Sequence, residues 1–177
     1  MPLERGYIQV YTGNGKGKTT AAIGLAVRAV GADLQVLFIQ FMKNYPYGEV
    51  TILQNLSTNL VLRRYGNDDF VFRKEHPSIE LIKEVKAGLR QAEQDMYSGR
   101  YDIVILDEVL VSIYFGLFNE EEIIQLMEKK PEQVELVLTG RYSTEAINKR
   151  ANLITEMKEI KHYYGIQGIG ARKGIES

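Results

Sequence analysis

Residues 12–20 carry the side chains and backbone groups that bind a triphosphate. They read Thr12-Gly13-Asn14-Gly15-Lys16-Gly17-Lys18-Thr19-Thr20. The N–H groups of such a glycine-rich turn converge on phosphate oxygens, and a following helix adds the positive end of its dipole. Lys18 supplies a point charge to the phosphates, and the Thr19 hydroxyl is placed to ligate Mg²⁺. We therefore predict that this turn binds a nucleoside triphosphate.

The segments on either side of the turn are those that a P-loop requires. Residues 7–11 have the composition of a strand, and the alanine-rich residues 21–30 that of a helix. The usual pattern, G-x-x-x-x-G-K-[ST], begins with a glycine where this chain has Thr12, and Gly13 follows it. A glycine-rich turn without a ligand is the alternative interpretation, but Gly-Lys-Thr between a strand and a helix argues against it.

A second group of chemically active side chains follows the apolar run at residues 103–106. Four β-forming residues lead into Asp107 and Glu108, which is the Walker B pattern of a buried strand that ends in carboxylates. Taken alone, the run fits an acidic helix start equally well. With the P-loop upstream, we expect Thr19, Asp107 and Glu108 to organise one Mg²⁺ or Mn²⁺ ion on the phosphates.

Arg141 is the third candidate. It follows an apolar strand at residues 134–138, at the strand end where ligands bind in open α/β sheets. Two interpretations remain open, an arginine that binds phosphate or carboxylate and an arginine that is only solvated.

These residues require an alternating order of strands and helices to bring them together. Further apolar runs at residues 36–39, 60–62 and 153–157 predict strands, and amphipathic or capped segments at residues 77–98 and 119–130 predict helices. We predict one α/β domain over residues 1–177, with the three-layer P-loop NTPase (RecA-like) fold and a mostly parallel sheet. Residues 67–76 are expected to be irregular, and residues 165–177 to form an ordered loop over the sheet edge.

Composition limits the class of protein. Of the 177 residues, 45% are hydrophobic and 25% are charged, as in soluble globular proteins, and the net charge of −1 gives no general attraction to nucleic acid or anionic membranes. The absence of cysteine excludes disulfides and cysteine-based metal sites. The polar first five residues do not resemble a secretory signal. We expect a cytoplasmic enzyme without nucleic-acid or membrane partners.

A P-loop predicts phosphate binding and leaves the reaction open. The residues alone are compatible with a kinase, an ATP-driven motor or switch, or a transferase that uses ATP in another way. Glu108 also suits a water-activating ATPase, and a regulatory protein that senses ATP without turnover is a further alternative.

The full set of segments resembles the P-loop corrinoid adenosyltransferases. The matching segments occur in the family's order at residues 12–20, 40–43, 48–49, 106–109, 138–141, 155–157, 161–162 and 174–176. The resemblance implies transfer of the 5′-deoxyadenosyl group from ATP, bound in a reversed sense, to the Co(I) of a corrinoid, with release of triphosphate. It implies catalytic roles for Lys18, Thr19 and Glu108, a homodimer, and a partner flavoprotein that reduces the cobalt.

One segment of the resemblance concerns the corrinoid. Residues 66–72 align with a family segment of the form Gly-x-Gly-Phe-Thr-Trp that packs against the lower face of the corrinoid. The resemblance therefore implies that Phe70 and Phe72 form the lower wall of the corrinoid site. From the residues alone, two phenylalanines in a polar loop fit core anchors at least as well.

Overall fold

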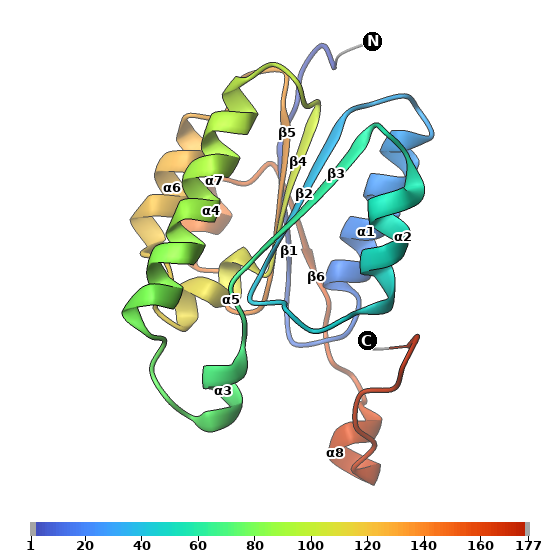
Figure 1. Ribbon diagram of the computed structural model, residues 1–177, viewed down its shortest axis with the longest axis vertical. Coiled ribbons are helices and arrows are strands. Elements are labelled where there is room, and N and C mark those ends of the chain that lie inside the picture. Colours follow the sequence, from blue (N-terminus) through green and yellow to red (C-terminus); the bar gives the residue numbers. More distant parts are fainter. Residues whose placement is uncertain (1–2, 176–177) are drawn as a thin grey trace.

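The computed structural model describes residues 3–175, which fold around one six-stranded sheet (Figure 1). Every pair of neighbouring strands is parallel, and the strand order is β3-β2-β4-β5-β1-β6. The strands are β1 (Ile8–Thr12), β2 (Val36–Phe41), β3 (Leu60–Tyr65), β4 (Ile103–Asp107), β5 (Glu135–Thr139) and β6 (Leu153–Glu156). The predicted strands are confirmed, and the sheet is parallel throughout.

Helices cover both faces of this sheet, which gives the predicted three layers. Helices α1 (Lys18–Val30) and α2 (Gly48–Leu56) lie on one face (Figure 1). The opposite face is covered by α4 (Ile79–Tyr97), α5 (Val109–Tyr114), α6 (Glu120–Glu128) and α7 (Glu145–Arg150). The short helices α3 (Asp69–Arg73) and α8 (Tyr163–Gln167) lie beyond the carboxyl ends of the strands. None of the helices within residues 3–175 has the length and apolarity to cross a membrane.

Strand β2 shows why the central strands of the sheet consist almost entirely of apolar residues. Val36 and Phe38 pack into the cluster that contains Ala22 and Ala26 of α1. The alternate residues, among them Leu37, pack into the larger cluster on the α4 side. Because successive side chains of a strand point to opposite faces, a strand that is covered on both sides is apolar along most of its length, and the buried Gln40 near the carboxyl end is the exception in β2.

The strand order places β5 between β1 and β4, so that the P-loop strand and the strand ending in Asp107 are not neighbours. Tyr11 of β1 pairs with Thr139 of β5, and Leu106 of β4 pairs with Leu138. The carboxyl ends of the three strands therefore lie along the same rim, the lower one in Figure 1. The loop after β1, the acids after β4 and the end of β5 all belong to this rim.

Two local expectations need correction, and one alternative holds in addition. Residues 67–76 contain the helix α3, in which Phe70 is buried and Phe72 is exposed. The acidic helix start, given as the alternative to a strand that ends in carboxylates, is present as well, because helix α5 begins directly after Glu108. The segment expected to be a loop over the sheet edge begins within α8, and Gly174 and Ile175 reach the rim instead of the edge strand. Glu176, the last residue of the matching segments, lies outside the described residues.

Candidate functional site

The main cavity of the described chain lies at the carboxyl rim of the sheet and has a volume of about 500 Å³. This volume is in the usual range for small-molecule and cofactor sites. The P-loop residues 14–20 form one wall. The remaining lining residues are Ile23, Lys43, Tyr47, Gly48, Glu49, Glu108, Arg141, His162, Gly174 and Ile175. Four of the lining side chains are cationic and two are acidic, so the cavity suits a polyanion.

The P-loop is held in shape by the end of β6. The N–H of Gly15 donates a 2.7 Å hydrogen bond to the carbonyl oxygen of Met157. Gly13 has φ 100°, and a Cβ at this position would lie 2.4 Å from the same oxygen. Only glycine allows the loop to approach β6 so closely. The neighbouring strand therefore fixes the loop from behind, with the loop residues 14–20 facing the cavity.

Lys18 is the first residue of α1, and its side chain folds back over the loop. Its Nζ donates to the carbonyl oxygens of Gly13, at 2.8 Å, and of Gly15, at 2.7 Å. Burial lowers the pKa of Lys18, and the adjacent cations Arg141 and Lys43 add to this effect, while Glu108 and Asp107 oppose it. The ammonium is thus held at the position from which it could exchange the loop carbonyls for phosphate oxygens.

Asp107 lies beneath the cavity and is fully buried. Its Oδ1 accepts hydrogen bonds from the Thr19 hydroxyl at 2.9 Å and from the Thr139 hydroxyl at 2.7 Å. Its Oδ2 accepts from Lys43 Nζ at 2.7 Å. Lys43 Nζ also lies 2.9 Å from Thr19 Oγ1. Helix α1, strand β5 and the turn after β2 thus meet the end of β4 at one carboxylate, because these segments converge on this rim.

Glu108 has an unusual backbone conformation for its residue type, with φ 62°. Its N–H donates a 3.0 Å hydrogen bond to Thr139 Oγ1, and the residue is the N-cap of α5. Left-handed conformations of residues other than glycine cost free energy and occur often at functional sites. Burial raises the pKa of Glu108, and the adjacent Asp107 carboxylate raises it further. The turn directs the Glu108 side chain into the cavity.

The oxygen atoms around Asp107 fit a hard divalent cation. Thr19 supplies a hydroxyl, and Asp107 and Glu108 supply carboxylates. The Oε1 atom of Gln40 is buried beside them and accepts no hydrogen bond from residues 3–175, so that it could accept one from a water on the ion. The same residues contain no group of three or more His, Cys, Asp or Glu side chains arranged around a metal.

The structure brings together most of the residues predicted from the sequence. Of the P-loop, residues 14–20 line the cavity, together with Glu108 and Arg141, and Asp107 lies directly below. Thr12 and Gly13 lie behind the loop, where the Thr12 hydroxyl accepts a 3.3 Å hydrogen bond from the N–H of Ser143.

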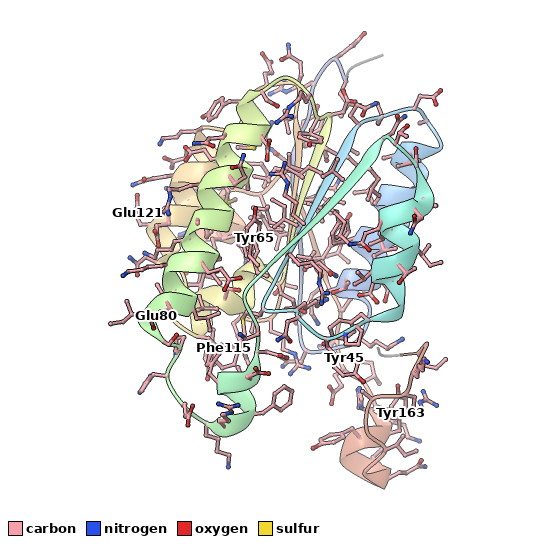
Figure 2. The ribbon with its side chains drawn as sticks, in the orientation of Figure 1. Tyr45, Tyr65, Glu80, Phe115, Glu121 and Tyr163 are labelled. Atoms are coloured by element: carbon pink, nitrogen blue, oxygen red, sulfur yellow. The ribbon has the colours of Figure 1, made fainter. Side chains whose placement is uncertain are left out.

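The two phenylalanines are separated. Phe70 is 6% exposed, and its ring packs edge-on against Phe115 with the centroids 5.7 Å apart. Figure 2 shows Phe115 at the lower rim, where α5 approaches α3. Phe72, two residues further along α3, is 79% exposed. Residues two apart on a helix point in different directions, so Phe70 belongs to the core and Phe72 faces outward.

A smaller cavity of about 180 Å³ adjoins the first. It shares Lys43, Tyr47 and Glu108 with the main cavity. Its remaining lining residues are Met42, Asp68, Val71, Val111 and Phe115. Burial raises the pKa of the Asp68 carboxyl. A mostly apolar recess therefore opens beside the cationic cavity, with Glu108 at the boundary.

Sequence analysis did not identify several residues of the site. The resemblance included the segments that contain Gln40, Lys43 and Thr139, but it assigned these three residues no role in the site. No role was predicted for Tyr47 or His162 either. The available signal was position, because polar side chains at the carboxyl ends of buried parallel strands gather at one rim. His162 Nδ1 accepts a hydrogen bond from the N–H of Tyr164 and so caps α8.

Comparisons with known proteins agree with the geometry. Residues 4–177 match the model of a family described as ATP:corrinoid adenosyltransferase BtuR/CobO/CobP. The chain is 33% identical over 174 residues to the corrinoid adenosyltransferase of Escherichia coli (strain K12), covering 98% of this chain and 86% of that protein. It is 32% identical over 174 residues to corrinoid adenosyltransferase CobA of Salmonella typhimurium (strain LT2), with the same coverage. A corrinoid adenosyltransferase of Sinorhizobium sp is 30% identical over 175 residues, covering 98% of this chain and 81% of that protein.

Proposed function

This chain belongs to the ATP:corrinoid adenosyltransferase family BtuR/CobO/CobP, and on that premise we propose that it transfers the 5′-deoxyadenosyl group of ATP to the Co(I) of a corrinoid. The observation that carries the proposal is the match to this family over residues 4–177. The paired cavities add support, since a cationic cavity for a triphosphate adjoins a mostly apolar recess across Glu108.

The reaction balances without a nucleophile from the protein. The electron pair of Co(I) forms the bond to C5′ of the ribose, and the bond between C5′ and its oxygen breaks. The triphosphate leaves with that electron pair, and the cobalt is formally oxidised from +1 to +3. The task left to the protein is to hold ATP in place and to stabilise the charge that develops on the leaving triphosphate.

The P-loop and its neighbours suit this task. In our proposal, Lys18 turns from the carbonyl oxygens of Gly13 and Gly15 towards the phosphates. Amides of the loop other than that of Gly15, which remains bonded to Met157, donate to the phosphate oxygens. Arg141 adds a second positive charge from the end of β5. The binding roles of Thr12 and Gly13 are then to shape the loop from behind.

We further propose Mg²⁺ as the cation of this site, held by Thr19, Asp107 and Glu108. A divalent ion bound there would neutralise part of the triphosphate charge. The test is to measure ATP binding and turnover in excess chelator. Loss of both on chelation and recovery with added Mg²⁺ is the expected result, and unchanged binding and turnover would contradict the assignment.

The function itself is tested by mixing the protein with ATP and chemically reduced corrinoid. The expected result is the light-sensitive absorption spectrum of the adenosylated corrinoid, together with inorganic triphosphate in the phosphorus NMR spectrum. Corrinoid-dependent formation of ADP would favour a kinase or an ATPase instead. ATP binding without any product would favour an ATP-sensing protein.

Three finer proposals accompany the function. A cobalt-reducing flavoprotein is the expected partner, because Co(I) is the nucleophile and the proposed chemistry does not generate it. A homodimer is proposed from the resemblance. A cytoplasmic location is proposed from the composition, since the absence of cysteine suits a reducing compartment. Size-exclusion chromatography with light scattering tests the homodimer, and a monomer would contradict it.

A further inference from the structure

Lys43 is directed to Asp107 by the turn at the end of β2. The strand ends at Phe41, and Met42 adopts φ 58° in the left-handed region. The N–H of Met42 donates a 3.0 Å hydrogen bond to the carbonyl oxygen of Tyr65 on β3. The turn is therefore anchored, and the side chain of Lys43, which follows it, points back across the end of β4. Only 12% of the Lys43 side chain is exposed.

The ammonium of Lys43 contacts the oxygens that would bind a divalent ion. Its Nζ is 2.7 Å from Asp107 Oδ2 and 2.9 Å from Thr19 Oγ1. Mg²⁺ binds oxygen at about 2.0–2.1 Å. An ion bound to the same two atoms would occupy the space of the ammonium group. The lysine and the metal therefore exclude one another at this position.

The charges around Lys43 explain why its ammonium lies beside Asp107. Asp107 is 0% exposed, and a buried carboxylate without a positive partner is strongly destabilising. Glu108 and Glu49 add further negative charge around Nζ. The ammonium of Lys43 forms an ion pair with Asp107 at 2.7 Å. Although burial lowers the pKa of Lys43, the carboxylates of Asp107 and Glu108 raise it overall.

We propose that Lys43 is an internal counter-cation of the Thr19 and Asp107 oxygens, which it holds in the nucleotide-free protein and leaves when a divalent ion enters with the triphosphate. The Tyr47 ring, whose centroid is 5.6 Å from Nζ, and the phosphates themselves provide contacts for the displaced ammonium. The proposal rests on the nucleotide and metal roles given above and not on the corrinoid chemistry.

This exchange has a measurable consequence. In the nucleotide-free protein a divalent ion must displace Lys43 and then remain beside its positive charge, so binding is weak. Without the lysine charge, the same oxygens attract the ion more strongly. Removal of Lys43 is therefore expected to increase the affinity for a divalent ion in the absence of nucleotide. A residue whose only task is to bind phosphate would not have this effect.

The experiment measures Mn²⁺ binding to the full chain without nucleotide, from the electron paramagnetic resonance signal of free Mn²⁺. We expect Lys43→Met to lower the Kd for Mn²⁺ by about tenfold or more, because it removes a unit charge a few ångströms from the ion. Lys16→Met is the matched control, since it removes an equal charge from the exposed part of the same cavity. Its Kd should change much less.

The outcomes are distinct. A Lys43→Met protein that binds Mn²⁺ no more tightly than the wild type would overturn the proposal, as would an equal gain in Lys16→Met. The gain should disappear in the double variant Lys43→Met with Asp107→Asn, and a gain that persists would place the ion elsewhere. If Lys43→Met does not fold, Lys43→Gln gives the same test, because its amide can still donate to Asp107. None of these measurements involves ATP or corrinoid, so their failure is separate from failure of the proposed function.

Discussion

Thr139 Oγ1 lies 2.7 Å from Asp107 Oδ1 and donates a hydrogen bond to it, while accepting one from the N–H of Glu108. A single hydroxyl at the end of β5 therefore fixes both acids at the end of β4. The relationship exists because β5 lies between the P-loop strand and β4. Thr139, at the carboxyl end of β5, therefore lies next to the end of β4, where both acids are.

We expect Thr139→Val to lower both stability and turnover. The isosteric change leaves a buried carboxylate oxygen and a backbone N–H each short of one partner, which costs about 1–3 kcal/mol per group. Chemical denaturation and the adenosylation assay measure the two effects. Thr139→Ser keeps the hydroxyl and should restore turnover. A valine variant as active as the wild type would show that this hydroxyl does not position the acids.

Lys18→Ala should abolish use of ATP. A charged hydrogen bond contributes about 1.5–3 kcal/mol, so calorimetry should show ATP affinity reduced by roughly tenfold or more. Circular dichroism should remain that of the folded protein. Lys149→Ala, which removes an exposed lysine of α7, controls for the loss of one positive charge. Near-normal turnover of Lys18→Ala would remove this lysine from the mechanism.

Alanine substitutions should separate Phe70 from Phe72. Phe70→Ala removes a buried ring that packs on Phe115 and should cost about 3–5 kcal/mol of stability. Phe72→Ala should leave the melting temperature unchanged, because its ring is exposed. If Phe72 contributes to the corrinoid wall, its loss reduces corrinoid turnover while ATP binding persists. Normal turnover of a folded Phe72→Ala protein would exclude that role.

Asp68 should make stability fall as the pH rises. Burial raises the pKa of this carboxyl in the folded protein, so the native state binds more protons than the unfolded chain between the ordinary aspartate pKa and the raised value. As the pH rises through this window, Asp68 ionises more readily in the unfolded chain, so the free energy of unfolding falls. Below the window Asp68 is protonated in both states and no longer affects stability. Asp68→Asn should raise the melting temperature at pH 7 and have little effect near pH 3, where both states are protonated. A lower melting temperature at pH 7 would contradict the assignment.

The layers of the fold could be predicted because their signals are local. A buried parallel strand is an uninterrupted apolar run, as at residues 103–106, and a covering helix is periodic, as at residues 79–97. Helix α3 could not be found in this way. It has five residues, too few for a period, and is held by the contact of Phe70 with Phe115, which is 45 positions away in the chain.

The residues of the candidate site also fall into those that could be predicted from local sequence and those that could not. The P-loop and the two acids are recognisable because each is a continuous motif. The role of Lys43 depends on the pairing of Gln40 with Asp107, which places the end of β2 beside the end of β4. Gly174 and Ile175 reach the cavity only through the path of the chain after β6. Neither arrangement has a signature in neighbouring residues.

The strand that braces the P-loop is the least protected one in the sheet. All four residues of β6 are exposed, and the strand hydrogen-bonds to β1 alone within the described chain. Local opening of such an edge has a small free energy compared with global unfolding. When β6 separates from β1, the Met157 carbonyl leaves Gly15, and the loop loses its backing in the same event. Amide hydrogen exchange in β6 and in the loop should therefore be coupled, and a nucleotide held by the loop should slow exchange along β6 as well.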